Sequence, residues 1–142
     1  HSPAADEEKD NESRDIWQAW GGLNAIQFFL PMMFDMVVHQ KKLCPSLIAK
    51  VMDYNPAKVF GFYGQKGAFE IGFDADAVIL DPEKPWKVEQ EKLFTKGHVT
   101  CFDGLEGKGA PTCTVIRGRV VAKDGMYVEE AKGFGKYVTP VR

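Results

Sequence analysis

The chain has 142 residues, of which 44% are hydrophobic and 27% are charged, a composition typical of a globular protein of one ordinary domain. Its formal net charge of −2 provides no electrostatic reason to expect binding to nucleic acid or to an anionic membrane. No apolar run reaches the length of about 18 residues that a membrane-spanning helix needs, so no membrane partner is expected.

The first part of the chain is predicted to be a solvated loop followed by a helix. Residues 4–15 are polar and densely charged, which favours a loop. Residues 16–42 are predicted to be helical, because apolar residues recur at spacings of three and four after the Gly21-Gly22 pair. Pro31 should kink this helix or mark a helix start. Part of the apolar helix face is expected to lie exposed in the isolated chain, namely Leu23, Ile26, Leu30 and Phe34.

A second helical segment is predicted over residues 45–52, because Pro45 suits the first turn of a helix. A short turn should follow over residues 55–60. Pro56 restricts the backbone of Asn55 to extended geometry, so the helix is expected to stop before it.

From residue 66 onward the pattern changes from helix to strand. Residues 77–80 form a short apolar strand that should end at Asp81-Pro82, and residues 112–121 alternate as one longer strand. Asp124-Gly125 is a strong hairpin signal before a return strand, and residues 133–142 are expected to be irregular. The order of loop, helices and strands fits a self-contained α+β domain, and it also fits the end of one domain followed by part of another.

The spacing of cysteines and histidines does not indicate a metal site within the chain. Cys44, Cys101 and Cys113 are odd in number and form no CxxC pair, which favours reduced thiols in a cytoplasmic protein over disulfides or structural zinc. His39 and His98 have no partner at the spacing that zinc ligands use, so each is interpreted as an ordinary histidine.

Several motifs in the second half resemble one family when they are taken together. They are Asn55 to Gly61, Lys66-Gly67, Gly72 to Pro82, and Thr114 to Val121 with Asp124-Gly125. They are similar to the C-terminal signature of the cyclic-amidohydrolase branch of the amidohydrolase superfamily, which includes allantoinases, dihydroorotases and dihydropyrimidinases or hydantoinases. The residues themselves predict turns and strand starts rather than chemistry.

The resemblance implies an α/β fold cut across two domains. Residues 1–62 would be the end of a TIM (β/α)8 barrel with its last helices. Residues 63–142 would supply strands of a small flanking β-sandwich and the C-terminal tail. The missing N-terminal barrel portion would then be a partner of this chain, and the intact protein would be a homo-oligomer, commonly a tetramer in this family.

The first residues bear on catalysis through the same resemblance. His1-Ser2-Pro3 is similar to the stretch that follows the catalytic aspartate of allantoinases, so the chain is expected to start at a cut just after that residue. The resemblance therefore implies no catalytic residue and no metal ligand in this chain. Two divalent metals, expected to be zinc, would be bound upstream, and the chain alone should be inactive. His1 would contact the substrate at the barrel mouth or serve a structural role in the loop.

The stretch from Ala19 to Gln27 resembles allantoinases in particular, where a Trp-Gly-Gly follows the last barrel strand. In this branch the backbone of the loop holds the amide edge of the substrate ring, which implies that Gly21 and Gly22 bind substrate. Glycine suits that role because no Cβ blocks a ligand. The alternative interpretation of the two glycines is a simple helix-entry turn.

The function implied is hydrolysis of allantoin to allantoate, with a small cyclic amide as substrate. Ala4 stands where dihydroorotases commonly carry a histidine, which argues against that activity. Ala4 and Asn24 also depart from the allantoinase pattern. A hydantoinase or dihydropyrimidinase is therefore an alternative, as is a non-catalytic, dihydropyrimidinase-like scaffold.

Overall fold

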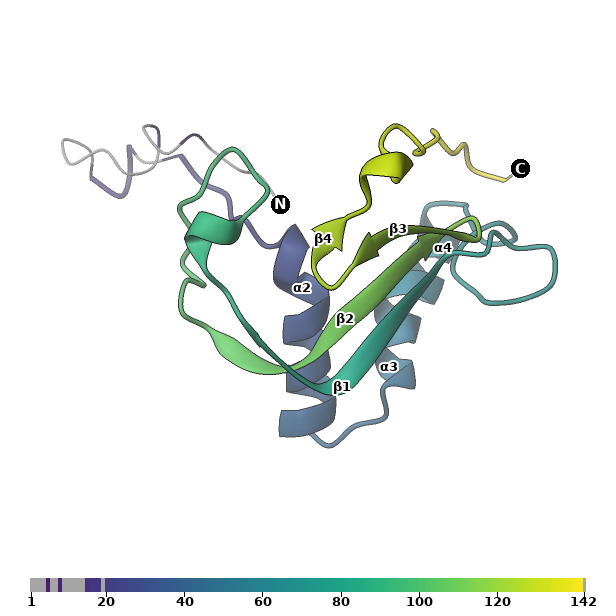
Figure 1. Ribbon diagram of the computed structural model, residues 1–142, viewed down its shortest axis with the longest axis horizontal. Coiled ribbons are helices and arrows are strands. Elements are labelled where there is room, and N and C mark those ends of the chain that lie inside the picture. The colour runs from purple at the N-terminus through teal and green to yellow at the C-terminus, as the bar shows by residue number, and fades with distance from the viewer. Residues whose placement is uncertain (1–4, 6–7, 9–14, 19, 142) are drawn as a thin grey trace.

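The computed structural model describes residues 5, 8, 15–18 and 20–141, and within them two helical segments stand against a twisted antiparallel sheet (Figure 1). The first segment is α2 (Ile26–Phe34), which runs directly into the π-helical turn η1 (Asp35–Gln40). The second consists of α3 (Ser46–Ala49), the π-helical turn η2 (Lys50–Tyr54) and α4 (Asn55–Val59). The strands are β1 (Ala77–Lys87), β2 (Glu106–Ile116), β3 (Arg119–Lys123) and β4 (Met126–Tyr127), and two 3-10 turns, η3 (Gln90–Lys92) and η4 (Glu129–Ala131), complete the fold.

The first helix is shorter than the predicted range of 16–42. Residues 20–25 have no regular structure, and Gly22 has a φ of 120°, which a right-handed helix excludes. Pro31 does not mark a helix start, because it lies inside α2. The expected exposed face is only half correct: Leu23 and Ile26 are 46% and 71% exposed, whereas Phe34 is only 8% exposed because it packs on the sheet.

The prediction that the second helix stops before Pro56 is wrong. Asn55 has helical backbone angles, with φ −65° and ψ −47°, and the helix continues to Val59. The cause is the π-helical turn η2, in which the Asn55 N–H donates to the carbonyl of Lys50, five residues earlier. This wider turn accommodates a residue that has no N–H of its own.

All four strands belong to one sheet, in the order β1-β2-β3-β4, and every pairing is antiparallel. The predicted end of the first strand at Asp81-Pro82 is wrong, because β1 runs on to Lys87 with register shifts on either side of that point. Pro82 and Pro85 are tolerated there because β1 is an edge strand with irregular pairing.

The predicted single strand over residues 112–121 is a hairpin. Arg117 and Gly118 both have positive φ, 46° and 77°, and they turn the chain between β2 and β3. A two-residue turn with positive φ at both positions matches the right-handed twist of the two strands that it connects. The hairpin turn predicted at Asp124-Gly125 is confirmed between β3 and β4, and residues 134–141 are irregular, as expected for the tail.

Two buried clusters join the helices to the sheet side of the molecule. One contains Phe28, Val88 and Leu93. The other contains Phe34, Val37 and Ile48, with Leu80 of β1 packed against it. Helix α2 therefore packs against the interior of β1 and β2 and against the segment that follows β1. Within the described residues, no helix has the length and apolarity to cross a bilayer.

Candidate functional site

The loop that precedes α2 carries the two glycines expected to bind substrate. Gly21 is exposed, and a Cβ built on it would meet no atom within 4 Å. Gly22 has a φ of 120°, a conformation that L side chains rarely adopt. Because α2 begins only at Ile26, both glycines lie upstream of its first turn. The loop thus combines open space at Gly21 with a backbone conformation at Gly22 that favours glycine.

A hollow of about 430 Å³ opens next to this loop, between the start of α2 and the segment that follows η3. Its lining is largely apolar and consists of Asn24, Ala25, Ile26, Gln27, Phe28, Leu93, Phe94 and Thr95. Asn24 is only 2% exposed, and it separates the exposed loop from the helix. The sequence did not indicate that residues near 95 would lie here, because only the tertiary fold brings them to the helix.

The remaining predicted site residue, His1, lies outside the described residues. Among the residues that the structure does describe, no three histidine, cysteine, aspartate or glutamate side chains gather as a metal site. The described part of the chain therefore does not fit the two metals that the family resemblance implies. His39 has a packing role instead, since its Nε2 lies 2.8 Å from the carbonyl oxygen of Pro82 and its ring meets Phe34 edge-on.

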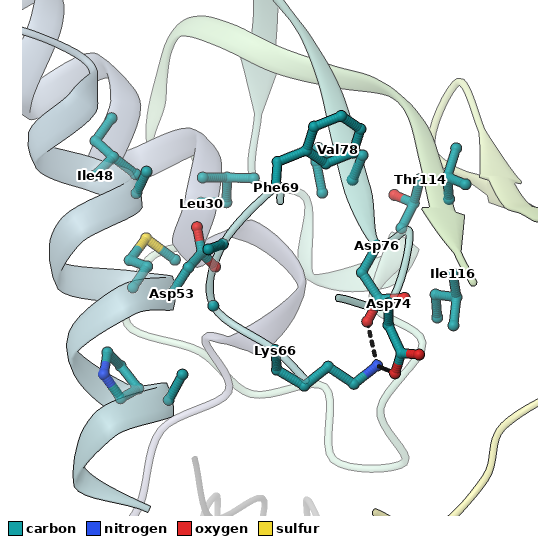
Figure 2. A pocket seen from close by; sticks show the side chains of 18 of the residues that line it. Leu30, Ile48, Asp53, Lys66, Phe69, Asp74, Asp76, Val78, Thr114 and Ile116 are labelled. Carbon is teal, nitrogen blue, oxygen red and sulfur yellow. Dashed lines mark hydrogen bonds and ion pairs between the residues drawn. The ribbon is translucent and has the colours of Figure 1, made fainter. Parts of the chain in front are cut away.

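A larger groove of about 700 Å³ separates the second helical segment from the sheet (Figure 2). Apolar side chains such as Leu30, Ile48 and Val78 form most of its lining. Asp53 also lines it, and burial raises the pKa of this carboxyl. Most of the groove is thus an apolar surface that suits packing against another element.

One edge of the groove carries a compact ion-pair cluster, in which Lys66 contacts both Asp74 and Asp76 (Figure 2). The Lys66 Nζ lies 2.7 Å from Asp74 Oδ2, and its hydrogen bond holds the pKa of Asp74 below the ordinary value. Asp76 also accepts the backbone N–H of Arg117 at 2.8 Å. The cluster thereby fixes the start of β1 to the β2–β3 turn, which is a structural role.

This cluster predicts a pH-dependent effect of Lys66→Met. Because the folded-state pKa of Asp74 is lowered, the pair stabilises the fold above the unfolded pKa of about 3.9, and the contribution is lost as pH falls through the folded pKa. Lys66→Met should therefore lower the urea-unfolding midpoint at pH 7. Its effect should be much smaller at a pH below the folded-state pKa of Asp74. Lys132→Met is the control, because its partner Glu129 is 3.6 Å away and both side chains are exposed. If Lys66→Met lowers the urea-unfolding midpoint equally at pH 7 and below the pKa of Asp74, the ion pair does not stabilise the fold.

Comparison with known proteins finds relatives that match almost the whole chain. Residues 13–121 match the model of the Amidohydrolase family. The chain is 38% identical over 133 residues to the L-hydantoinase of Paenarthrobacter aurescens, covering 94% of this chain and 29% of that protein. It is 34% identical to the allantoinase of Rubrobacter xylanophilus, covering 100% of this chain and 30% of that protein.

The same likeness is present in three dimensions. The solved structure of the L-hydantoinase (dihydropyrimidinase) from Arthrobacter aurescens matches with a TM-score of 0.80 and 37% identity, covering 86% of this chain and 27% of that one. The chain thus spans about 30% of the length of the curated relatives it matches.

Proposed function

Because this chain belongs to the amidohydrolase family, we propose that it is the C-terminal part of a metal-dependent hydrolase that opens a cyclic amide ring. The observation that carries the proposal is the match to relatives named for this chemistry along almost the whole chain. In the reaction, the oxygen of water bonds to the ring carbonyl carbon, the bond to the ring nitrogen breaks, and that nitrogen takes a proton. The resemblance implies that the metal ligands and the catalytic aspartate lie upstream of this chain, so the proposal places the bond-breaking chemistry in the remainder of the enzyme.

We propose that this chain supplies part of the substrate wall. The loop of Gly21 and Gly22 brings backbone N–H and C=O groups to a place where Gly21 borders open space, which suits the amide edge of a ring. Orienting a ring in this way contributes to catalysis by fixing the reacting geometry. Residues 1–62 would then be the end of the barrel and residues 63–142 part of the flanking sandwich. The helices-then-antiparallel-sheet order supports this division.

Allantoin is the substrate we propose first, since the stretch from Ala19 to Gln27 resembles allantoinases. Hydantoin is the second candidate, because the L-hydantoinase relative is 38% identical. Both compounds share a five-membered hydantoin ring, whereas dihydrouracil has six members. Assays of the full-length enzyme with allantoin, hydantoin and dihydrouracil separate these candidates. Turnover of hydantoin without allantoin would replace the first candidate by the second, and no turnover of any of the three would overturn the proposed function.

The substrate-wall proposal predicts a specific effect of Gly22→Ala. The φ of 120° at Gly22 would have to change, and the loop backbone would move with it. We expect kcat/KM for the accepted substrate to fall by about 100-fold, since a displacement of about 1 Å can have that effect. Gly118→Ala is the matched control, because Gly118 also has positive φ but lies in the β2–β3 turn. Steady-state kinetics that give the two variants equal kcat/KM would contradict a substrate role for the loop.

A further inference from the structure

The buried side chain of Asn24 joins the glycine loop to a distant segment of the chain. Its Nδ2 donates to the carbonyl of Gly97 and, at 3.2 Å, to that of Val99. In return, the hydroxyl of Thr100 donates to the backbone carbonyl of Asn24 at 3.4 Å. The Oδ1 of Asn24 is buried and has no partner among the described residues. The amide therefore acts at this place through its two N–H donors.

Gln27, one turn further along, contacts the same segment with both ends of its amide. Its Nε2 donates to the carbonyl of Lys92 at 3.1 Å, and its Oε1 accepts the N–H of Phe94 at 2.8 Å. Residues 92–100 are thus bound along their backbone by two side chains, Asn24 just before α2 and Gln27 in its first turn. Backbone groups held by side chains in this way define the position of a loop that has no regular structure.

Apolar side chains also pack across this junction. Phe28, Val88 and Leu93 form a buried cluster, and the ring of Phe28 meets that of Phe102 edge-on at 5.5 Å. Residues on both sides of the hydrogen-bonded junction therefore belong to one core. A change at the junction should be transmitted to the loop, because Gly22 and Leu23 immediately precede Asn24 in the chain.

We propose that Asn24 and Gln27 are positioning residues, which hold the loop of residues 20–23 in place by tying it to residues 92–100. The proposal rests on the proposed function, in which this loop faces the substrate ring. It assigns to residues 92–100 the role of a support behind the substrate wall. Since ring orientation depends on the position of the loop, the junction determines how well rings of different size fit.

The test compares Asn24→Asp and Gln27→Glu with the control Gln65→Glu in the full-length protein. Asn24→Asp presents a carboxylate to two carbonyls, whereas Gln27→Glu loses only the donor to Lys92 and keeps the acceptor for Phe94. Gln65 also donates through its amide, to Asp74 at 3.3 Å, but it lies near the groove of Figure 2, away from the glycine loop. Because Gln27 is exposed, its variant keeps the test valid if Asn24→Asp does not fold.

Hydrogen–deuterium exchange is the first readout, and it does not require activity. We expect faster exchange in peptides covering residues 20–24 and 92–100 for Asn24→Asp and, to a smaller extent, for Gln27→Glu, with no such change for Gln65→Glu. Unchanged exchange over residues 20–24 in both variants would overturn the proposal. If the unsubstituted protein hydrolyses no cyclic amide, the proposed function fails, while exchange still decides whether the two amides hold the loop.

The second readout is the ratio of kcat/KM for the accepted five-membered ring, allantoin or hydantoin, to that for dihydrouracil. Loss of folded enzyme lowers both values equally, so a merely structural role leaves this ratio unchanged. We expect a positioning role to shift the ratio by about tenfold, within the range that small displacements of a binding wall produce. Faster exchange with an unchanged ratio would overturn the positioning role and leave Asn24 as a structural residue only.

Discussion

Gly109→Ala is expected to lower the free energy of unfolding by about 2–5 kcal/mol, the sum of a left-handed backbone and an overpacked core. Gly109 has a φ of 94°, and a Cβ built on it would overlap Cδ1 of Phe34 and lie 2.8 Å from Cε1 of the same ring. Phe34 is itself buried between Val37 and Ile48, so its ring has little room to move. Urea unfolding of the variant and the unsubstituted protein measures the loss.

Two further variants separate the clash from the backbone strain. Gly118→Ala also has a positive φ, but no atom lies near its Cβ, so we expect a loss of only about 1–2 kcal/mol. Combining Gly109→Ala with Phe34→Ala removes the ring that the new methyl group meets. The double variant should therefore be more stable than the sum of the single losses implies. Additive losses would show that Gly109 and Phe34 do not clash.

The close approach at Gly109 illustrates what sequence patterns can predict for this fold. The apolar spacing correctly placed a helix around Leu30, and Asp124-Gly125 correctly marked a hairpin, because each signal is local. No local signal shows that β2 crosses α2 at Gly109, since that contact joins residues far apart in sequence. The π-helical turn before Pro56 was missed for a related reason: it is an exception to the local rule that the residue before proline is extended.

The sequence likewise predicted the candidate site only in part. The resemblance drew attention to Gly21 and Gly22, and the structure places both in the irregular loop before α2, with open space at Gly21. It drew no attention to the side chain of Asn24, whose bonds reach residues 97 and 99. A buried asparagine next to a helix start has no distinctive sequence pattern, so only the fold identifies it.

The groove of Figure 2 can be interpreted only when the fold and the comparisons are taken together. It is a largely apolar surface of a chain that spans about 30% of its relatives' length. Monomeric proteins rarely leave large apolar surfaces open. This observation supports the proposal that the chain works as part of a larger hydrolase.

Phe28→Ala is expected to cost about 3–5 kcal/mol, the usual range when a buried phenylalanine is truncated. Phe28 is only 7% exposed and packs with Val88 and Leu93. Because Phe28 and Leu93 line the same hollow as Asn24, the loss of this cluster should also loosen the glycine loop. We therefore expect a lower thermal unfolding midpoint and faster hydrogen–deuterium exchange over residues 20–24.

Phe28→Leu is the conservative comparison, since it keeps most of the buried volume and should cost clearly less than the alanine variant. Phe102 provides a second check, because its ring meets that of Phe28 edge-on. A double-mutant cycle with Phe102→Leu should show a coupling of about 0.5–1.5 kcal/mol between the rings. If Phe28→Ala lowers stability without changing exchange over residues 20–24, the core and the loop are independent. In that case, the loop would be held by the hydrogen bonds of Asn24 and Gln27 without support from this cluster.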